Sequence, residues 1–310
     1  MRFLMIDRIC ELEPGVHARG IKNISWDCEF LEEFFPGIPV FSPVIAAEAA
    51  AQLVSWAIIT ARDFTVKPVI TIVDSYRCSG HFHPGDQIEV CGTIERMADE
   101  SGLAHGTLQV RGRTVLEIRH AVCYLYPLVE LDPPDRARQQ FNNLYLPGAP
   151  LPDPTQCGTF VPAREQVPLP QQRWIDRIVA SSDRSIVGIK NFTATADYFN
   201  DHFPNKPVVP GVIIIQSMIS LAKHLADHIL ASVAGSEKRV VLMQSEKIKF
   251  RTFIRPGDQL LIQADLKAWG DSTSSFVVSG TINGKNVASL RLFFDHVTRD
   301  EYIQRYCAGL

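Results

Sequence analysis

The chain has 310 residues, of which 46% are apolar and 21% are charged, and its formal net charge is −3. This length suggests about two domains, each apolar enough to bury an ordinary core. The slightly negative charge argues against a nucleic-acid partner, because nucleic-acid-binding proteins normally present a strongly basic face. Seven cysteines, an odd number without a CxxC pair, favour reduced thiols and a cytoplasmic location.

The first part of the chain predicts two short strands, a loop and a helix. Asp7 and Arg8 interrupt the apolar start MRFLMIDRICELEPG, so we expect no signal peptide. The strand FLMIDRI and a second strand precede an irregular, proline-marked loop. A long apolar helix is predicted over residues 43–61, and its Glu48 and Gln52 favour a buried core helix over a membrane span. β-rich segments joined at Pro-Gly-Asp turns follow.

A different composition marks residues 127–170, which hold ten of the twenty prolines in the chain. Such a segment is typical of a linker that is extended and semi-rigid rather than helical. A linker of this length can cross the surface of one folded unit to reach another. We therefore predict an N-terminal unit over residues 1–126, the proline-rich linker, and a C-terminal unit over residues 171–310.

The C-terminal unit repeats the N-terminal one. WIDRI at 174–178 repeats MIDRI at 5–9, and IKNFTATADYFNDHFPNKPVVPGVIIIQ at 189–216 aligns without a gap with IKNISWDCEFLEEFFPGIPVFSPVIAAE at 21–48. A second apolar helix is predicted over residues 211–230. An apolar helix followed by antiparallel strands indicates an α+β unit in which a sheet wraps round a buried helix. We expect the two units to pack as a covalent pseudo-dimer.

The motif N…F..HFP..PV.PGV, with an acid five residues past the position of its glycine, carries a family resemblance. It resembles the 3-hydroxyacyl-thioester dehydratases of bacterial fatty acid synthesis, of the FabA/FabZ type, over most of both repeats but not over the linker. The resemblance implies a double hotdog, in which each repeat is an antiparallel sheet wrapped round a long central helix. It also implies an enzyme that needs no cofactor.

In that family the histidine of one hotdog works with a carboxylate from the central helix of its partner. The resemblance therefore makes His202 the expected base, and imidazole titrates close to neutral pH. Glu48 is the expected acid, and the alanines around it should raise its pKa. The N–H of Gly211, at the start of a helix, is expected to bind the thioester oxygen.

Each of these three residues has a counterpart at the aligned position of the other repeat, and the three counterparts are expected to form an inert pseudo-site. Phe34 stands at the position of the histidine and cannot move a proton. Gln216 stands at the position of the acid. Pro43 matches the glycine but has no N–H to donate. The two repeats together therefore carry one complete set of groups.

Two further residues are expected to support this set. Gln52 lies four residues after Glu48 on the same helix face and should orient its carboxyl group. The carbonyl of Val208 corresponds to the family's acceptor for the other ring nitrogen of the histidine. Asp201 departs from the family, which usually has glycine there, and its carboxylate either raises the pKa of His202 or points to solvent.

Two pairs of histidines have a spacing that suits a metal ion, but neither has a third ligand in view. His81 and His83 alternate as strand residues do, and His224 and His228 lie four residues apart on the second helix. We therefore predict no metal site.

Three basic residues, Lys247, Lys249 and Arg251, alternate along a predicted strand and so share one face. Such a face is usually only solvated. The alternative is a dock for the phosphates of an acidic acyl carrier or of coenzyme A.

The predicted function is a dehydratase that converts 3-hydroxyacyl thioesters, carried on acyl carrier protein or coenzyme A, to trans-2-enoyl thioesters. The alternative is a non-catalytic hotdog module that binds acyl chains or acts as a scaffold in a fatty acid or polyketide pathway. The sequence leaves open the chain length, the carrier, the pathway, an isomerase activity and the association of the pseudo-dimer into a homo-oligomer.

Overall fold

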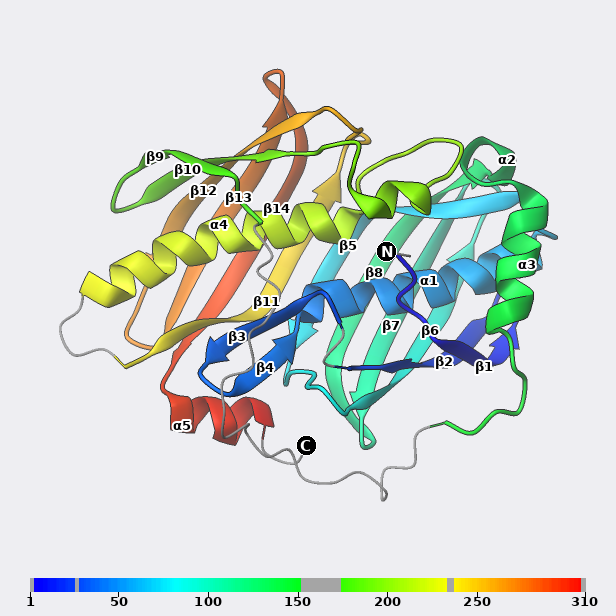
Figure 1. Ribbon diagram of the computed structural model, residues 1–310, viewed down its shortest axis with the longest axis horizontal. Helices are drawn as coiled ribbons and strands as arrows, with labels where there is room; N and C mark the ends of the chain where they lie inside the picture. The colour runs from blue at the N-terminus through cyan, green and yellow to red at the C-terminus, as the bar shows by residue number, and fades with distance from the viewer. Residues whose placement is uncertain (1–2, 26–27, 152–173, 233–236, 308–310) are drawn as a thin grey trace.

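An antiparallel sheet of twelve strands dominates the structure, a computed structural model that describes residues 3–25, 28–151, 174–232 and 237–307 (Figure 1). The strand order is β1-β2-β6-β7-β8-β5-β11-β14-β13-β12-β10-β9. The strands span β1 Arg8–Glu13, β2 His17–Asn23, β5 Val66–Cys78, β6 Gln87–Met97, β7 Ser101–Val110, β8 Arg113–Pro127, β9 Arg177–Ser181, β10 Ser185–Asn191, β11 Arg239–Phe250, β12 Gln259–Trp269, β13 Thr273–Ile282 and β14 Lys285–Val297.

The sheet consists of two six-stranded halves with the same internal order, one from each sequence repeat. β1, β2, β6, β7, β8 and β5 of the first repeat correspond to β9, β10, β12, β13, β14 and β11 of the second. The halves join where β5 pairs with β11, with Val73 opposite Ile248 and Tyr76 opposite Ser245. This arrangement confirms the predicted double hotdog.

Each half carries one long helix on the same face of the sheet (Figure 1). α1 spans Pro43–Ala61 and α4 spans Gly211–Ser232, close to the predicted ranges. The side chain of Ser42 caps α1 by accepting from the N–H of Ile45, and Pro43 stands in the first turn, where its missing N–H is no loss. α1 is long and apolar enough to cross a membrane by composition alone, but 61% of its apolar window is buried inside the fold.

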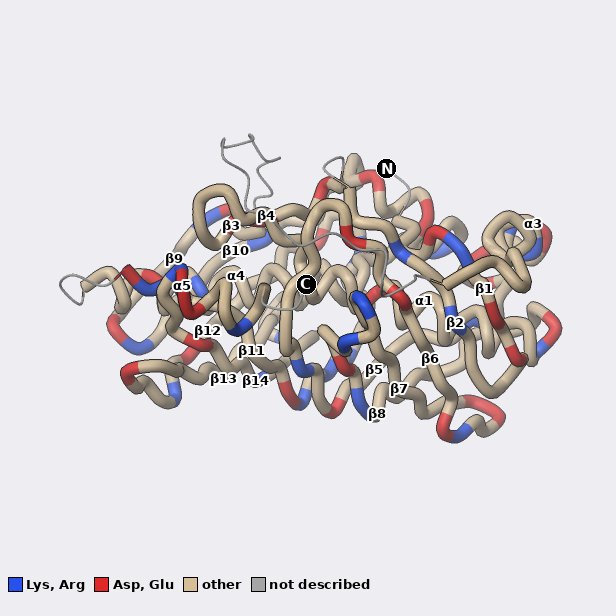
Figure 2. Tube along the Cα trace, turned by 90° about the horizontal axis from the view of Figure 1, so that it is seen from below, with Lys and Arg blue, Asp and Glu red and all other residues tan. Residues whose placement is uncertain are grey.

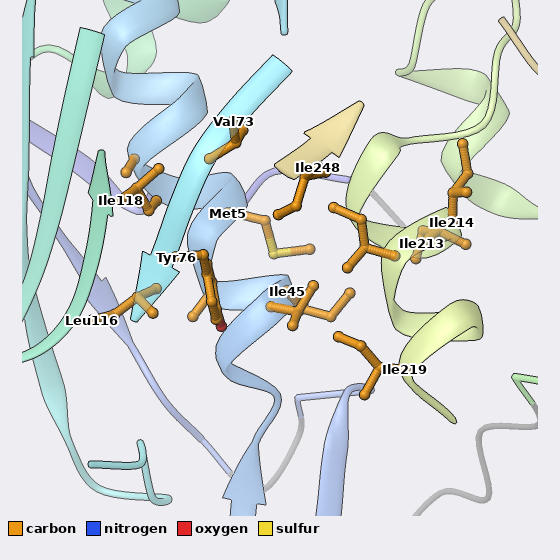
Figure 3. Packing of buried hydrophobic residues seen from close by; sticks show 14 of the residues in the cluster. Met5, Ile45, Val73, Tyr76, Leu116, Ile118, Ile213, Ile214, Ile219 and Ile248 are labelled. Atoms are coloured by element: carbon orange, nitrogen blue, oxygen red, sulfur yellow. The ribbon is translucent and has the colours of Figure 1, made fainter. Parts of the chain in front are cut away.

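The two helices meet where the halves join, and the core is continuous there. Figure 3 shows Ile45 of α1 between Tyr76 of β5 and Ile219 of α4, all members of one buried cluster. Ile45 is fully buried, and Tyr76 and Ile219 are 4% and 5% exposed. The repeats therefore share one hydrophobic core.

The segment before the central helix differs between the repeats. In the first repeat β3 (Leu31–Phe35) and β4 (Ile38–Phe41) form a two-stranded hairpin that turns at Gly37, where φ is 76°. In the second repeat a short 3₁₀ turn, η1 (Asp197–Asn200), precedes an irregular loop. The prediction of an irregular loop is wrong for the first repeat, because the β-prone residues on both sides of the Pro-Gly turn pair with each other.

The described part of the chain ends under this hairpin. α5 (Arg299–Tyr302) and η2 (Ile303–Cys307) follow β14, and they carry two tyrosines into a small second core. The ring of Tyr302 lies 5.2 Å from that of Phe35, centroid to centroid. The C-terminal repeat thus supports the hairpin of the N-terminal repeat.

Two helices lie within the segment that the composition predicts to be extended. α2 spans Leu128–Leu131 and α3 spans Pro134–Leu144. The prediction is wrong for these residues because Pro133 and Pro134 stand at the start of α3, where proline is tolerated, and the rest of α3 contains no proline. Residues 152–170 of the predicted linker lie outside the described residues, and the boundaries of the units stay a prediction.

Charged residues of both signs are spread over the molecule. Figure 2 shows Lys and Arg interspersed with Asp and Glu along the strands and loops of this view. Several form ion pairs, among them Lys67 with Asp132 and Arg136 with Asp201. The mixture of signs agrees with the small net charge of −3.

Gly106 on β7 allows α1 to lie directly on the sheet. A Cβ atom added there would come within 2.7 Å of the Cβ of Ala50 on α1. We predict that Gly106→Val lowers the free energy of unfolding by about 1–3 kcal/mol, because the added methyl groups overpack this contact. Chemical denaturation measures the change. Thr107→Val is the matched control, because Thr107 points to the opposite face of the strand, and equal losses in both variants would contradict this packing.

Candidate active site

A cavity of about 400 Å³ is lined by the five residues that the sequence analysis assigned to the working site. Glu48 and Gln52 reach it from α1. His202 and Val208 reach it from the loop before α4, and Gly211 reaches it from the first position of α4. The rest of the wall is mostly apolar. The structure therefore brings residues of both repeats to one shared cavity.

His202 follows η1, and the contacts of its ring include a hydrogen bond and a stacked neighbour. Its Nδ1 lies 3.1 Å from the carbonyl oxygen of Val208. Because a carbonyl can only accept, Nδ1 carries the hydrogen, and Nε2 is the basic nitrogen of the neutral ring. The ring also stacks on Phe203, with the centroids 4.1 Å apart. Burial lowers the pKa of His202 to about 4, so the ring is neutral at pH 7.

Glu48 lies on α1 between Ala47 and Ala51, which also line the cavity. Its Oε1 accepts a hydrogen bond from Nε2 of Gln52 at 3.0 Å. Burial raises the pKa of Glu48 to about 7, although the hydrogen bond from Gln52 and the charge of Lys67 act in the opposite direction. A carboxyl group with this pKa exists in both forms near neutral pH and can donate a proton.

The amide of Gln52 also binds the N-terminal segment. Its Oε1 accepts from the N–H of Met5 at 2.9 Å, and its Nε2 donates to the carbonyl oxygen of Phe3 at 3.1 Å. The ring of Phe3 meets that of His202 edge to face, with the centroids 6.1 Å apart. Gln52 therefore connects Glu48 to a segment that packs on the histidine.

Gly211 is the first residue of α4, so its N–H has no carbonyl partner within the helix. A Cβ atom at this position would lie 2.9 Å from Cζ of Phe250, so only glycine fits against that ring without a shift. Because Gly211 lines the cavity, the positive end of a helix lies at the cavity wall. At the matching position α1 begins with Pro43, which has no N–H to offer.

Lys67 on β5 is a cavity residue that the sequence did not reveal. Its Nζ lies 3.3 Å from Oδ2 of Asp132, the residue after α2, and 4.5 Å from the ring centroid of Phe203. Burial is the largest influence on the pKa of both Glu48 and His202, and the charge of Lys67 lowers both pKa values. A lone lysine near the start of an apolar strand gives no sign of a partner 65 residues further along the chain.

Asp201 is bonded through both carboxylate oxygens. Its Oδ1 lies 2.6 Å from Nη2 of Arg136 on α3, and its Oδ2 accepts from the N–H of Phe3 at 3.2 Å. Of the two expected alternatives, the carboxylate in solvent does not describe Asp201, because its carboxylate is paired. Asp201 is not among the groups that shift the pKa of His202, which burial lowers. Asp201 therefore links α3 and the N-terminal segment to the histidine loop.

The three positions assigned to the inert pseudo-site do not line this cavity. Gln216 donates through Nε2 to Oε1 of Glu32 at 2.7 Å and accepts from Oγ of Ser42 at 2.8 Å. Phe34 packs on the ring of His81, with the centroids 5.4 Å apart. Burial raises the pKa of Glu32 to about 7. A second carboxyl group with a raised pKa, which the sequence did not reveal, therefore occupies this region.

The histidine pairs have other surroundings. Nδ1 of His81 lies 3.0 Å from the hydroxyl oxygen of Tyr302, and Nδ1 of His83 lies 2.7 Å from the carbonyl oxygen of Pro39. The second pair is exposed on α4. Within the part of the chain that the structure describes, no three His, Cys, Asp or Glu side chains are grouped to hold a metal ion.

The basic residues of β11 and of the loop after it, Lys247, Lys249 and Arg251, are all exposed. A bulge at Lys247, where φ is 52°, interrupts the strand alternation that placed them on one face. Arg251 also lines the cavity, and its Nη1 donates to Oδ1 of Asn286 at 2.8 Å. A role in binding phosphates stays a prediction.

Comparisons with known proteins agree with this fold. The model of the FabA-like domain matches residues 1–119, and that of the ApeI dehydratase matches residues 179–291. The dehydratase domain of PpsC from Mycobacterium tuberculosis, solved in complex with C12:1-CoA, superposes with a TM-score of 0.54 at 14% identity. The match covers 96% of this chain and 100% of that chain. At this identity the likeness shows a shared fold.

Two relatives are 3-hydroxyacyl-[acyl-carrier-protein] dehydratases named FabZ. The one from Alkalilimnicola ehrlichii is 44% identical over 94 residues, which are 30% of this chain and 61% of the relative, so the chain spans less than two thirds of that protein. The one from Bartonella bacilliformis is 35% identical over 119 residues, which are 38% of this chain and 76% of the relative. The chain therefore belongs to the family of the FabZ-type 3-hydroxyacyl-[acyl-carrier-protein] dehydratases.

Proposed function

We propose that this protein dehydrates 3-hydroxyacyl thioesters to trans-2-enoyl thioesters at one site shared by the two repeats. The observation that carries the proposal is a pair of opposite pKa shifts in one cavity, to about 4 for His202 and to about 7 for Glu48. At neutral pH the imidazole is free to accept a proton, and much of the carboxyl group still holds one to donate. Two titratable groups whose environments separate their roles in this way are typical of an acid–base pair.

The reaction removes a proton from C2 of the substrate and the hydroxyl group from C3. Nε2 of His202 takes the C2 proton, and the electron pair of that bond becomes the second bond between C2 and C3. Glu48 protonates the hydroxyl group, so the C3–O bond breaks and water leaves. The proton on His202 then passes to the carboxylate of Glu48 by exchange with water, which restores both groups.

Three neighbours assist this transfer. The N–H of Gly211 is available to an enolate oxygen, and one such donor contributes about 100- to 1000-fold in rate. The carbonyl of Val208 holds the hydrogen on Nδ1 of the imidazole, which keeps Nε2 free for the substrate. Gln52 holds the carboxyl group of Glu48 in place.

The proposal assigns one working site to each chain. The opposite combination of halves would have to use Phe34 as base, Gln216 as acid and Pro43 as donor, and none of these can move or donate the necessary proton. Gln216 is instead bonded to Glu32 across the two repeats. This hydrogen bond is one of several contacts between the two repeats.

The substrate in this proposal is an acyl thioester carried by acyl carrier protein or coenzyme A. The mostly apolar walls of the cavity suit an acyl chain, and the few polar groups suit its thioester end. The names of the FabZ relatives favour acyl carrier protein. A cytoplasmic location belongs to the same proposal, since all six cysteines of the described residues are free thiols.

The first test compares the two helices at matched positions. We predict that Glu48→Gln and His202→Ala each lower kcat/KM for a 3-hydroxyacyl thioester by about 100- to 10,000-fold, because each removes a proton-transfer group. The assay follows the enoyl absorbance. Gln216→Ala, at the position that matches Glu48, is the control and should leave kcat/KM nearly unchanged. Equal damage from Gln216→Ala and Glu48→Gln would refute the single site.

The second test is the pH dependence of kcat/KM. The active form needs His202 neutral and Glu48 protonated, so activity should fall as the pH drops through about 4 and as it rises through about 7. Glu32→Gln is the control, because Glu32 has a similar pKa but lies outside the cavity, so its loss should not move the upper limb. The roles of His202 and Glu48 would be contradicted if kcat/KM kept rising above neutral pH. They would also be contradicted if Glu32→Gln moved the pH at which kcat/KM falls on the alkaline side.

A further inference from the structure

The cavity extends along α1 well beyond the proposed acid. Glu48, Gln52, Trp56 and Ile59 all line it, and they follow one another at intervals of three to four residues on one side of the helix. Glu48 and Ile59 are separated by about 16 Å along the helix axis. The cavity therefore has room for an acyl tail that lies parallel to α1.

One end of the cavity is open and the other is closed. Arg251 and Thr252 are exposed lining residues, and they follow Phe250, whose ring touches Gly211 near the proposed site. At the far end three lining residues are buried, since Trp56 is 7% exposed, Ile59 is 1% exposed and Ala137 of α3 is 1% exposed, while Gln140 of α3 is partly exposed. α3 therefore forms part of the closed end.

Aromatic and charged contacts hold α3 against the last turn of α1. The ring of Phe141 lies 5.7 Å from that of Trp56 and 5.9 Å from that of Phe64. Nη2 of Arg138 donates to Oδ1 of Asp63 at 2.9 Å. In Figure 1, α3 crosses the end of α1 that lies away from α4.

α3 is also tied to the other repeat. Arg136 pairs with Asp201, the residue before His202, at 2.6 Å. On the side of α3 that faces the cavity, Ala137 and Gln140 are the lining residues. α3 lies outside both regions that the family models match, residues 1–119 and 179–291. This wall is therefore a property of the inter-repeat segment.

We propose that α3 sets the upper length of the acyl chain that this cavity accepts, with Ala137 and Gln140 as the residues that meet the end of the chain. The ligand class is a linear acyl group with an apolar tail. A longer tail would have to displace packed side chains at Ala137 or bring methylene groups against the amide of Gln140, which loses hydrogen bonds to water without gaining any from the tail. The inference rests on the proposed function for the identity of the ligand. The experiment that tests it measures binding and does not depend on that function.

The test measures the binding of saturated acyl-pantetheines of increasing chain length to the full chain by calorimetry. These probes have no C3 hydroxyl group, so binding is measured without turnover. In Ala137→Phe the affinity for the longest chains should fall about tenfold or more, because terminal methylenes lose their burial, while the affinity for the shortest chains stays unchanged. Gln139→Phe is the matched control, because Gln139 is exposed on the same helix and should bind every chain as the wild type does.

A second variant tests the wall in the opposite direction. Gln140→Ala removes a partly exposed side chain, which leaves the buried core untouched, and should increase the affinity for chains just above the wild-type limit. The proposal would be overturned if Ala137→Phe and Gln140→Ala bound chains of every length with the affinity of the wild type. It would also be overturned if Gln139→Phe lost as much affinity for the longest chains as Ala137→Phe does. If α3 variants changed the preferred chain length in binding but the wild type dehydrated no 3-hydroxyacyl thioester, only the proposed catalysis would be overturned.

Discussion

The antiparallel pairing of β5 with β11 is the contact on which the rest of the structure depends. It fixes the register of the two repeats, with Tyr76 opposite Ser245, and places α1 and α4 on one face of a common sheet. Glu48 belongs to α1, and His202 belongs to the loop before α4. Their side chains share a cavity because the pairing of β5 with β11 holds these two elements together. Neither repeat alone contains the lining of this cavity.

Burial in this shared cavity acts on the two groups in opposite directions. It disfavours the charged form of each, which lowers the pKa of the imidazole and raises that of the carboxyl group. A neutral base and a protonated acid are the forms that a dehydration requires at its start. The positive charge of Lys67, held by Asp132, keeps the pKa of Glu48 from rising further. One environment therefore prepares both partners for the proposed chemistry.

The sequence predicted those parts of the fold that depend on residues close together along the chain. The apolar run from Pro43 to Ala61 predicted the range of α1, and the gapless repeat together with the family resemblance led to the double hotdog. The prolines of the linker concealed α3, because proline excludes a helix from its interior but not from its first turn. The contacts of Lys67 with Asp132 and of Gln216 with Glu32 join distant segments, so no pattern along the chain announces them.

We propose that each chain has one working site, made from both repeats. Calorimetric titration with a saturated acyl-pantetheine that fits the cavity counts the binding sites without relying on turnover. We expect one molecule to bind per chain and to compete with the 3-hydroxyacyl substrate. Binding of two equivalent molecules per chain would show that the region of Phe34 and Gln216 is also a working pocket, which would contradict a single site.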